Sequence, residues 1–225
     1  MRYAIYYCPA ADTALGRLGH DWLAASSPSI RLPGIRSERR DALLTDVRRY
    51  GWHATVRAPF TPIVSAGHDE VHTAVAMLAQ NFASFELTLR LDRLAGFLCL
   101  RPMADGGPER LLAAACLDAL HPFCASLTDE ALQHRRAGLA ADELALLQKH
   151  GYPYVLDRYR FHLTLSAPAT EIEERAMRQW LQPRVDGLRS TRIESLAICR
   201  EATPGAAFEL LERIALLAPD MEHTA

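Results

Sequence analysis

The sequence lacks several features that would assign the protein to a specialised class. No apolar run approaches the ~18 residues of a membrane span, and the first residues enter Arg2–Tyr7 without the apolar core of a signal peptide. The formal net charge is only −2, so there is no global positive field to bind long nucleic acid. We therefore expect a cytoplasmic protein that acts without a membrane and without long nucleic acid.

Disulfide and metal patterns are also missing. The five cysteines are scattered, with no Cys-x-x-Cys pair, which indicates small buried residues in a reducing compartment. No His-x-His or His-Glu-x-x-His motif occurs. His68 and His72, spaced i, i+4 on a predicted helix, could ligate zinc, but such a pair is more often a polar helix face. We predict no metal and no other cofactor.

The composition is sufficient for a folded core. Of 225 residues, 49% are hydrophobic and 23% are charged, which suits one large domain or two small intimate lobes. We treat residues 1–225 as a single domain. Seven arginines and three acids lie between Arg31 and Arg57, and a second basic stretch runs from Lys149 to Arg160. These stretches are either solvated faces or contacts for an anionic substrate.

One ten-residue pattern occurs twice in the chain. Tyr-Gly-Trp-His-Ala-Thr-Val-Arg-Ala-Pro occupies 50–59, and Tyr-Arg-Phe-His-Leu-Thr-Leu-Ser-Ala-Pro occupies 159–168. The copies share a tyrosine, an aromatic residue, a histidine, a threonine, an alanine and a proline at matching positions. A single His-x-Thr arises by chance in many proteins, whereas this pair with matched flanks is specific.

Alternation along a strand places the polar members of each copy on one face. These residues are His53, Thr55, Arg57, His162, Thr164 and Ser166. The ordinary histidine pKa is about 6.5, so one imidazole can be neutral and its partner charged at neutral pH. Two imidazoles that flank a phosphate supply the base and the acid of an in-line displacement. The hydroxyls can donate to phosphoryl oxygens.

The secondary-structure pattern repeats with the motif. Each copy is followed by a helix and then by two strands, which predicts a duplicated α+β fold of two lobes. Each lobe is expected to be a small, mostly antiparallel sheet with helices, related to the other by an approximate two-fold around a central cleft. The motif strands would face each other across that cleft. The first lobe covers about 36–105, inserted helices about 106–150, and the second lobe about 151–218.

The expected elements are as follows. Before the first motif we predict a strand at 2–8, a helix from Asp12 or Thr13 to Ala25, a loop at 26–35 and a helix at 38–48. After that motif come a helix at 68–82 and strands at 85–91 and 96–100. Helices at 108–123 and 139–149 precede the second motif, and a helix at 170–181 and strands at 191–199 and 207–217 follow it.

The two motifs and their flanks resemble the 2H phosphoesterase superfamily, over nearly the whole chain. The phrases Arg49–Thr55, Gly151–Val155 and Tyr159–Leu165 are similar to a branch identified in bacteria as phosphonate metabolism proteins. The resemblance implies metal-free cleavage of a cyclic phosphate or related phosphodiester. By position it implies His53 and His162 as the catalytic pair, with Thr55 and Thr164 as phosphate donors.

Our hypothesis is a metal-independent phosphoesterase acting on a small phosphorylated sugar or nucleotide, with a small-molecule phosphate ester as its partner. Arg57, Ser166, Tyr6 and Tyr154 are the predicted substrate-binding residues. A charged Arg57 near His53 would lower the pKa of that histidine, which favours His53 as base and His162 as acid. The alternative is a non-catalytic nucleotide- or RNA-binding module on the same fold, which would not need the acid–base pair.

Overall fold

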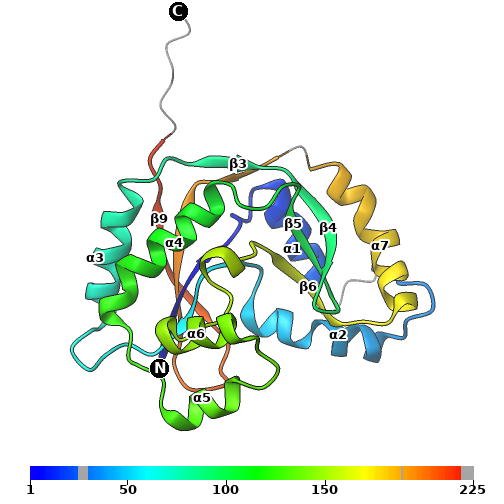
Figure 1. Ribbon diagram of the computed structural model, residues 1–225. Helices are drawn as coiled ribbons and strands as arrows, with labels where there is room; N and C mark the ends of the chain where they lie inside the picture. The colour runs from blue at the N-terminus through cyan, green and yellow to red at the C-terminus, as the bar shows by residue number, and fades with distance from the viewer. Residues whose placement is uncertain (25–29, 189, 219–225) are drawn as a thin grey trace, which may run out of the picture.

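A seven-stranded antiparallel sheet forms the centre of the protein. The computed structural model (Figure 1) describes residues 1–24, 30–188 and 190–218. The strand order is β4-β5-β6-β2-β1-β8-β9, and β3 and β7 form a separate antiparallel pair. The strands are β1 (Arg2–Tyr7), β2 (Ala54–Phe60), β3 (Phe85–Leu87), β4 (Leu89–Leu94), β5 (Phe97–Pro102), β6 (Leu163–Pro168), β7 (Thr191–Ile193), β8 (Ser195–Glu201) and β9 (Glu209–Ala215). The predicted α+β class with a mostly antiparallel sheet is confirmed.

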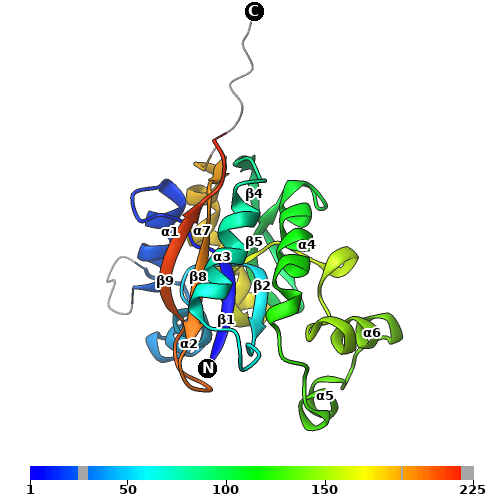
Figure 2. The ribbon, with the colours of Figure 1, turned by 90° about the vertical axis from the view of Figure 1, so that its left-hand side faces the viewer.

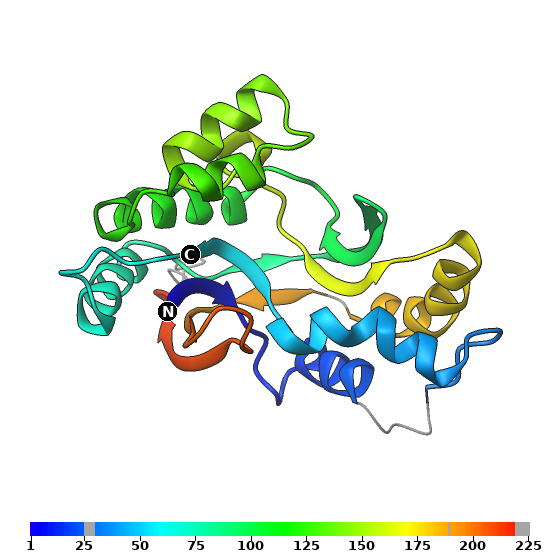
Figure 3. The same cartoon turned by 90° about the horizontal axis from the view of Figure 1, so that it is seen from below.

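Helices lie on both sides of this sheet. They are α1 (Ala14–Leu23), α2 (Ser37–Tyr50), α3 (His68–Ala79), α4 (Pro108–Leu120), α5 (Asp129–Arg135), α6 (Ala141–His150) and α7 (Glu171–Asp186), with 3₁₀ turns η1 (His121–Phe123) and η2 (Leu156–Arg158). Seen from below (Figure 3), α1 and α2, in blue, lie opposite the green helices of the insert. Within the described residues no helix combines the length and apolar character needed to cross a bilayer.

The two halves of the chain exchange their strands. Hairpin β4-β5 follows the first motif in sequence but pairs with β6 of the second motif. Hairpin β8-β9 follows the second motif but joins β1, which in turn pairs with β2. Strand pairing therefore crosses the sequence boundaries expected for the lobes, 36–105 and 151–218. The motif strands are neighbours in one sheet, and they do not face each other from two separate sheets.

Single residues interrupt two of the predicted strands. The strand expected at 85–91 divides at Thr88 into β3 and β4, and the one expected at 191–199 divides at Glu194 into β7 and β8. The carbonyls of Thr88 and Glu194 accept hydrogen bonds from the amides of Met103 and Leu216. These hydrogen bonds hold the chain to a neighbouring segment at the point where it passes from the small sheet to the large one.

Several helix boundaries differ from expectation. The helix expected to reach residue 123 ends at Leu120 and continues as η1, because Pro122 has no amide to continue the α-helical bonding. Helix α7 extends past the expected 181 to Asp186 despite Pro183. Helix α5 was not predicted. The expected helix end at Ala25 and part of the 26–35 loop lie outside the described residues.

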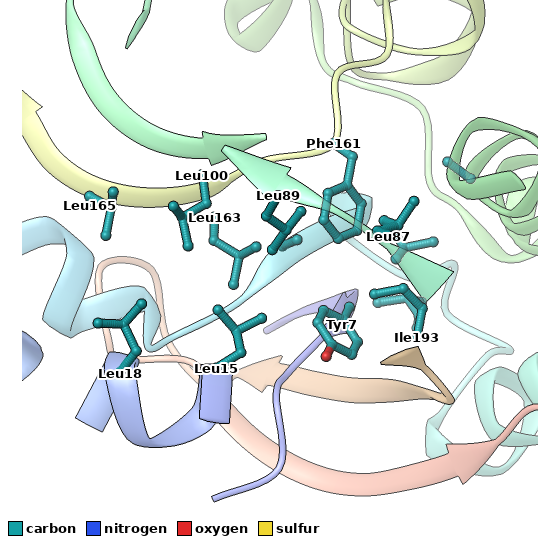
Figure 4. Close-up of a cluster of buried hydrophobic side chains, with 14 of the residues drawn as sticks. Tyr7, Leu15, Leu18, Leu87, Leu89, Leu100, Phe161, Leu163, Leu165 and Ile193 are labelled. Carbon is teal, nitrogen blue, oxygen red and sulfur yellow. The ribbon is translucent and has the colours of Figure 1, made fainter. Parts of the chain in front are cut away.

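The part of the main core that covers β6 lies on the face of the sheet toward α1. Leu163 and Leu165 of β6 pack with Leu15 and Leu18 of α1, and Tyr7 lies beside Phe161 (Figure 4). The indole of Trp22 donates to the carbonyl of Leu165 at 2.8 Å, which fixes α1 against β6. The opposite face carries a smaller buried cluster of Ala4, Tyr6, Ala197 and Cys199. Three of these side chains, those of Ala4, Ala197 and Cys199, are small, which leaves room for a site on that face.

Candidate active site

One cross-strand pair defines the site. Ala54 on β2 lies opposite Leu163 on β6 in antiparallel register, and both side chains are fully buried in the sheet. Continuing that register by one residue in each direction places His53 opposite Thr164 and Thr55 opposite His162. Cross-strand neighbours point to the same face, so the two imidazoles and two hydroxyls form a square on the face opposite the main core.

Both imidazoles are oriented by the same backbone contact. The Nδ1 atom of His53 lies 3.0 Å from the carbonyl oxygen of Gly51, and that of His162 lies 2.8 Å from the carbonyl oxygen of Arg160. A carbonyl oxygen only accepts, so each Nδ1 carries the proton and donates it. Each Nε2 is therefore the atom that exchanges a proton at the site. In the first motif that atom lies 3.4 Å from the hydroxyl of Thr55.

The chain before His53 is shaped by a turn and an anchor. Helix α2 ends at Tyr50 and is followed by Gly51, whose φ of 76° lies in the left-handed region that glycine adopts without strain. Trp52 then packs on α1, where its indole donates to the carbonyl of Leu15 at 3.0 Å. A Cβ at Gly19 would lie 2.2 Å from the Trp52 ring, so this close approach requires glycine. The two contacts hold the backbone on which His53 sits.

A different anchor precedes His162. Phe161 is buried in the core with 3% of its surface exposed. The hydroxyl of Tyr159 donates to the carbonyl of Thr55 at 2.9 Å and so links the second motif directly to β2. Tyr50, the matching residue of the first copy, instead lies near His53, with 6.3 Å between ring centroids.

Burial lowers the pKa of both motif histidines. For His53, burial and a positive charge on neighbouring His162 lower the pKa to about 4, partly offset by the bond to Gly51. For His162, burial and the nearby guanidinium of Arg101 lower the pKa, partly offset by the bond to Arg160. The arginine that acts on a motif histidine is thus Arg101 acting on His162, which differs from the predicted effect of Arg57 on His53.

A cavity of about 340 Å³ opens beside Thr55 and His162. Its walls are mainly apolar and aromatic, with three arginines among them. The lining includes Arg57, Leu94, Ala95, Phe97, Tyr152, Tyr154, Leu156, Arg158, Tyr159 and Arg160. Two lining residues other than glycine have positive φ, Ala95 at 46° and Leu156 at 53°. Such backbone strain concentrates at ligand sites, and the volume suits a small molecule.

Two of the predicted substrate-binding residues line this cavity. Tyr154 is 46% exposed and meets Tyr152 edge-on, with ring centroids 5.6 Å apart. Arg57 is 3% exposed, and its Nη2 donates to the carbonyl of His150 at 3.2 Å and to the Cys124 sulfur at 3.4 Å. Both residues are therefore positioned to contact a ligand in the cavity.

The other two predicted substrate-binding residues, Ser166 and Tyr6, have almost no exposed surface. Ser166 is fully buried, and its hydroxyl accepts from the amide of Leu98 at 3.3 Å, because β5 pairs with β6 at this point. Tyr6 is 1% exposed and stacks on His53 with 3.9 Å between ring centroids. Ser166 is thus a contact between strands, and Tyr6 is packed against His53 with almost no exposed surface.

The histidine pair considered as a zinc site lies elsewhere. His68 and His72 on α3 both contact Oε1 of Glu212 on β9, at 3.1 and 2.8 Å. Across residues 1–24, 30–188 and 190–218, no group of three or more histidine, cysteine, aspartate or glutamate side chains is arranged to hold a metal ion. The two imidazoles serve here as partners of one carboxylate.

The comparison with protein families identifies the chain. Residues 55–209 match the family described as Protein of unknown function (DUF1045). The chain belongs to the DUF1045 family. The matched segment contains the second motif, the inserted helices and hairpin β4-β5, and it ends at the first residue of β9. All the cavity-lining residues named above belong to this DUF1045 region.

Two curated proteins are similar to this DUF1045 chain. Both are named Ribose 1,5-bisphosphate phosphokinase PhnN. The one from Laribacter hongkongensis is 36% identical over 96% of this chain and 52% of its own length. The one from Janthinobacterium sp. is 34% identical over 95% of this chain and 50% of its own length. The chain therefore spans about half the length of the curated relatives it matches.

Two solved structures are also similar to this chain over nearly its whole length. TT0787 of Thermus thermophilus superposes with a TM-score of 0.50 at 14% identity, covering 97% of this chain and 100% of that one. E. coli LigT complexed with 3'-AMP matches with a TM-score of 0.45 at 14% identity, covering 96% and 97% of the two chains. At this identity the first likeness shows the fold alone. The fold implied by the resemblance of the two motifs is therefore confirmed.

Some residues of the site were not predicted from the sequence. Tyr159 matches Tyr50 between the copies, and this match was the available signal for its bridge to Thr55. Arg160 belonged to the basic stretch before the second motif, without any sign that it would line a cavity. Phe97 and Arg101 carry no signal in the sequence, because β5 reaches His162 only through the exchange of hairpins.

Proposed function

We propose that this protein is a metal-independent phosphoesterase that hydrolyses a cyclic phosphate or phosphodiester of a small phosphorylated sugar or nucleotide. The observation that carries the proposal is the matched pair of imidazoles on neighbouring strands. Each has its Nδ1 bound to a backbone carbonyl, at 3.0 Å for His53 and 2.8 Å for His162, which leaves each Nε2 for proton transfer. Two such groups supply the base and the acid that phosphoryl displacement needs.

The two histidines have different places relative to the cavity. His162 lines it, whereas His53 lies against Tyr6 on the side away from it. We assign the leaving group to the cavity. Nε2 of His53 takes a proton from the attacking water as its oxygen bonds to phosphorus. Nε2–H of His162 then gives a proton to the departing oxygen as the other P–O bond breaks.

The lowered pKa of His53 supports its assignment as the base. A pKa of about 4 keeps His53 neutral at neutral pH, as a base requires. The pKa of His162 is lowered in the free protein, and a bound phosphate anion would raise it and so provide the charged acid. Thr55 and Thr164 complete the square, and their hydroxyls donate to the non-bridging phosphoryl oxygens.

The size of the cavity and the names of the curated relatives support the proposed substrate class. The cavity of about 340 Å³ suits a compact molecule better than a polymer. The curated relatives are named for ribose 1,5-bisphosphate, which supports a phosphorylated sugar as the substrate. A role in phosphonate metabolism is a further proposal, resting on the similarity of the motif flanks to proteins of that group.

The test is hydrolysis of a panel of cyclic phosphates and phosphodiesters in the presence of EDTA. We expect turnover that EDTA does not abolish, loss of turnover in His53→Ala and in His162→Ala, and no loss in His134→Ala, a control at an exposed residue of α5. Abolition by EDTA with recovery on adding zinc would contradict the metal-free mechanism and direct attention to His68 and His72. Tight binding of nucleotides without turnover would favour the non-catalytic alternative.

A further inference from the structure

Arg57 is a buried cation without an acid partner. It is 3% exposed, and its neighbours in space are a carbonyl, a sulfur and the Phe60 ring, which lies 5.4 Å from the guanidinium carbon. Its Nε atom is buried and has no hydrogen-bond acceptor. Among the described residues no carboxylate lies within ion-pair distance of this guanidinium. Burial of an unpaired charge is costly, so such a group normally has an anionic partner.

Two acids of the surrounding elements form no ion pair with Arg57. Glu109 on α4 is also buried; its Oε1 accepts from the amides of Gly106 and Gly107 at the start of that helix, and its Oε2 is buried without a hydrogen-bond partner. Asp142 pairs with Arg158. The charge of Arg57 is therefore left to whatever occupies the cavity that this residue lines.

A second arginine lies on the same side of the site. Arg160 lies between the 3₁₀ turn η2 and β6, two residues before His162. Both arginines line the cavity. Nη1 of Arg160 donates to the carbonyls of Asp157 and Tyr159, at 2.9 and 2.7 Å, and in the described part of the chain this residue has no carboxylate partner either.

The inserted helices hold Arg57 in this position. The carbonyl that accepts from its Nη2 belongs to His150 at the end of α6, and the sulfur belongs to Cys124, directly after η1. Figure 2 shows α5 and α6 standing out from the body of the molecule beside α4. The insert thus forms a cavity wall, and it fixes the guanidinium two residues beyond Thr55 along β2.

We propose that Arg57, with Arg160, binds a second anionic group of the substrate that does not react. This inference rests on the proposed function, in which the scissile phosphate lies between the two histidines. Two residues of strand span about 7 Å, so the second anion lies within a small molecule's length of the first. The substrate class is therefore a small phosphodiester or cyclic phosphate that also carries a phosphate monoester.

The kinetic test compares two substrates that differ only in the second anion. A nucleoside 2′,3′-cyclic phosphate is assayed with and without a 5′-phosphate, using wild type, Arg57→Met, Arg57→Lys and the control Arg93→Gln, whose residue is paired with Glu174 at 3.1 Å outside the cavity. For wild type we expect a lower KM for the doubly charged substrate. Arg57→Met should reduce the ratio of the two kcat/KM values by roughly 10–100-fold, as loss of a charged hydrogen bond predicts. Arg57→Lys should fall between, and Arg93→Gln should keep the wild-type ratio.

An equal loss on both substrates in Arg57→Met would overturn the inference while leaving the phosphoesterase proposal intact. A binding measurement separates the two further, because it needs no turnover. Inorganic phosphate should raise the melting temperature of His53→Ala/His162→Ala, and adding Arg57→Met should remove that rise. If the triple variant still gains the full phosphate stabilisation, Arg57 does not bind the second anion, whatever the protein's activity.

Discussion

The phenol ring of Tyr6 stacks on the imidazole of His53, with ring centroids 3.9 Å apart and an angle of 26° between the planes. Tyr6 belongs to β1 and lies opposite Thr55 of β2, so the stacking partner of this imidazole comes from outside both motifs. The stack excludes water from one side of His53 and adds to the burial that lowers its pKa to about 4. It thus helps to set the protonation state of the proposed base.

Removal of either histidine should abolish most of the activity. We expect His53→Ala and His162→Ala each to lose roughly 10²–10⁴-fold in kcat/KM, as for loss of a general acid or base. The double variant should lose less than the product of the two single losses, because the residues act as one unit. Steady-state kinetics on a verified substrate tests this, with circular dichroism to confirm folding. Full kcat in either single variant would remove that histidine from the mechanism.

The leaving group should distinguish acid from base. With a substrate whose leaving group departs without protonation, such as a nitrophenolate, His162→Ala should regain most of its lost rate and His53→Ala should not. The measurement is the ratio of kcat/KM for the nitrophenyl and alkyl esters in each variant. Recovery in His53→Ala in place of His162→Ala would reverse the assignment.

Arg101 should influence the alkaline limb of the pH profile. Burial is the main cause of the lowered pKa of His162, and the guanidinium of Arg101 lowers it further, so Arg101→Gln should raise that pKa and keep the acid protonated to higher pH. We expect the alkaline limb of kcat/KM to move upward by roughly 0.5–1 pH unit, while the acid limb stays in place. Arg90→Gln is the matched control, because Arg90 shares the Asp92 carboxylate, at 3.1 Å against 3.2 Å for Arg101. An equal shift in both variants would contradict a specific effect of Arg101.

Acid should destabilise the protein partly through His53. Its folded pKa of about 4 lies below the ordinary 6.5, so between these values the unfolded chain binds a proton that the folded chain does not. The free energy of unfolding therefore falls as pH decreases through this window. His53→Gln should reduce the slope by up to about one proton, measured by urea unfolding at several pH values. The slope should persist in His134→Gln, and an unchanged slope in His53→Gln would show that His53 is not buried as described.

Ser166 and Thr164 should differ despite lying on one strand face. Ser166 is buried against the Leu98 amide, so Ser166→Ala should cost about 1 kcal/mol of stability and little activity. Thr164 lies beside His53 in the square, and Thr164→Val should lower kcat/KM by roughly 10–100-fold through loss of a hydrogen bond to the phosphate. Thermal melting and kinetics on both variants provide the comparison. A larger activity loss in Ser166→Ala than in Thr164→Val would contradict the placement.

The sequence patterns predicted most helices and strands, and each error in those predictions has a local structural cause. The alternation of Phe85–Leu91 indicated a strand, but no side-chain pattern marks Thr88 as the point where it changes sheets. The short helix α5 has no buried residue, so it lacks the apolar periodicity on which helix prediction depends. The helix at the insert's start was extended too far because Pro122 still allows a 3₁₀ turn.

By itself the sequence determined the two motifs, the shared face of each strand and the α+β class, because side-chain alternation and duplication are local and repeated properties. Only the tertiary structure decided which strands become neighbours, and with that which residues surround each imidazole. Tyr6, Arg101 and the cavity around Arg57 are contributed by β1, β5 and the inserted helices, which are distant from the motifs along the chain. The free energy that selects those contacts comes from burial across the whole sheet, which no single segment encodes.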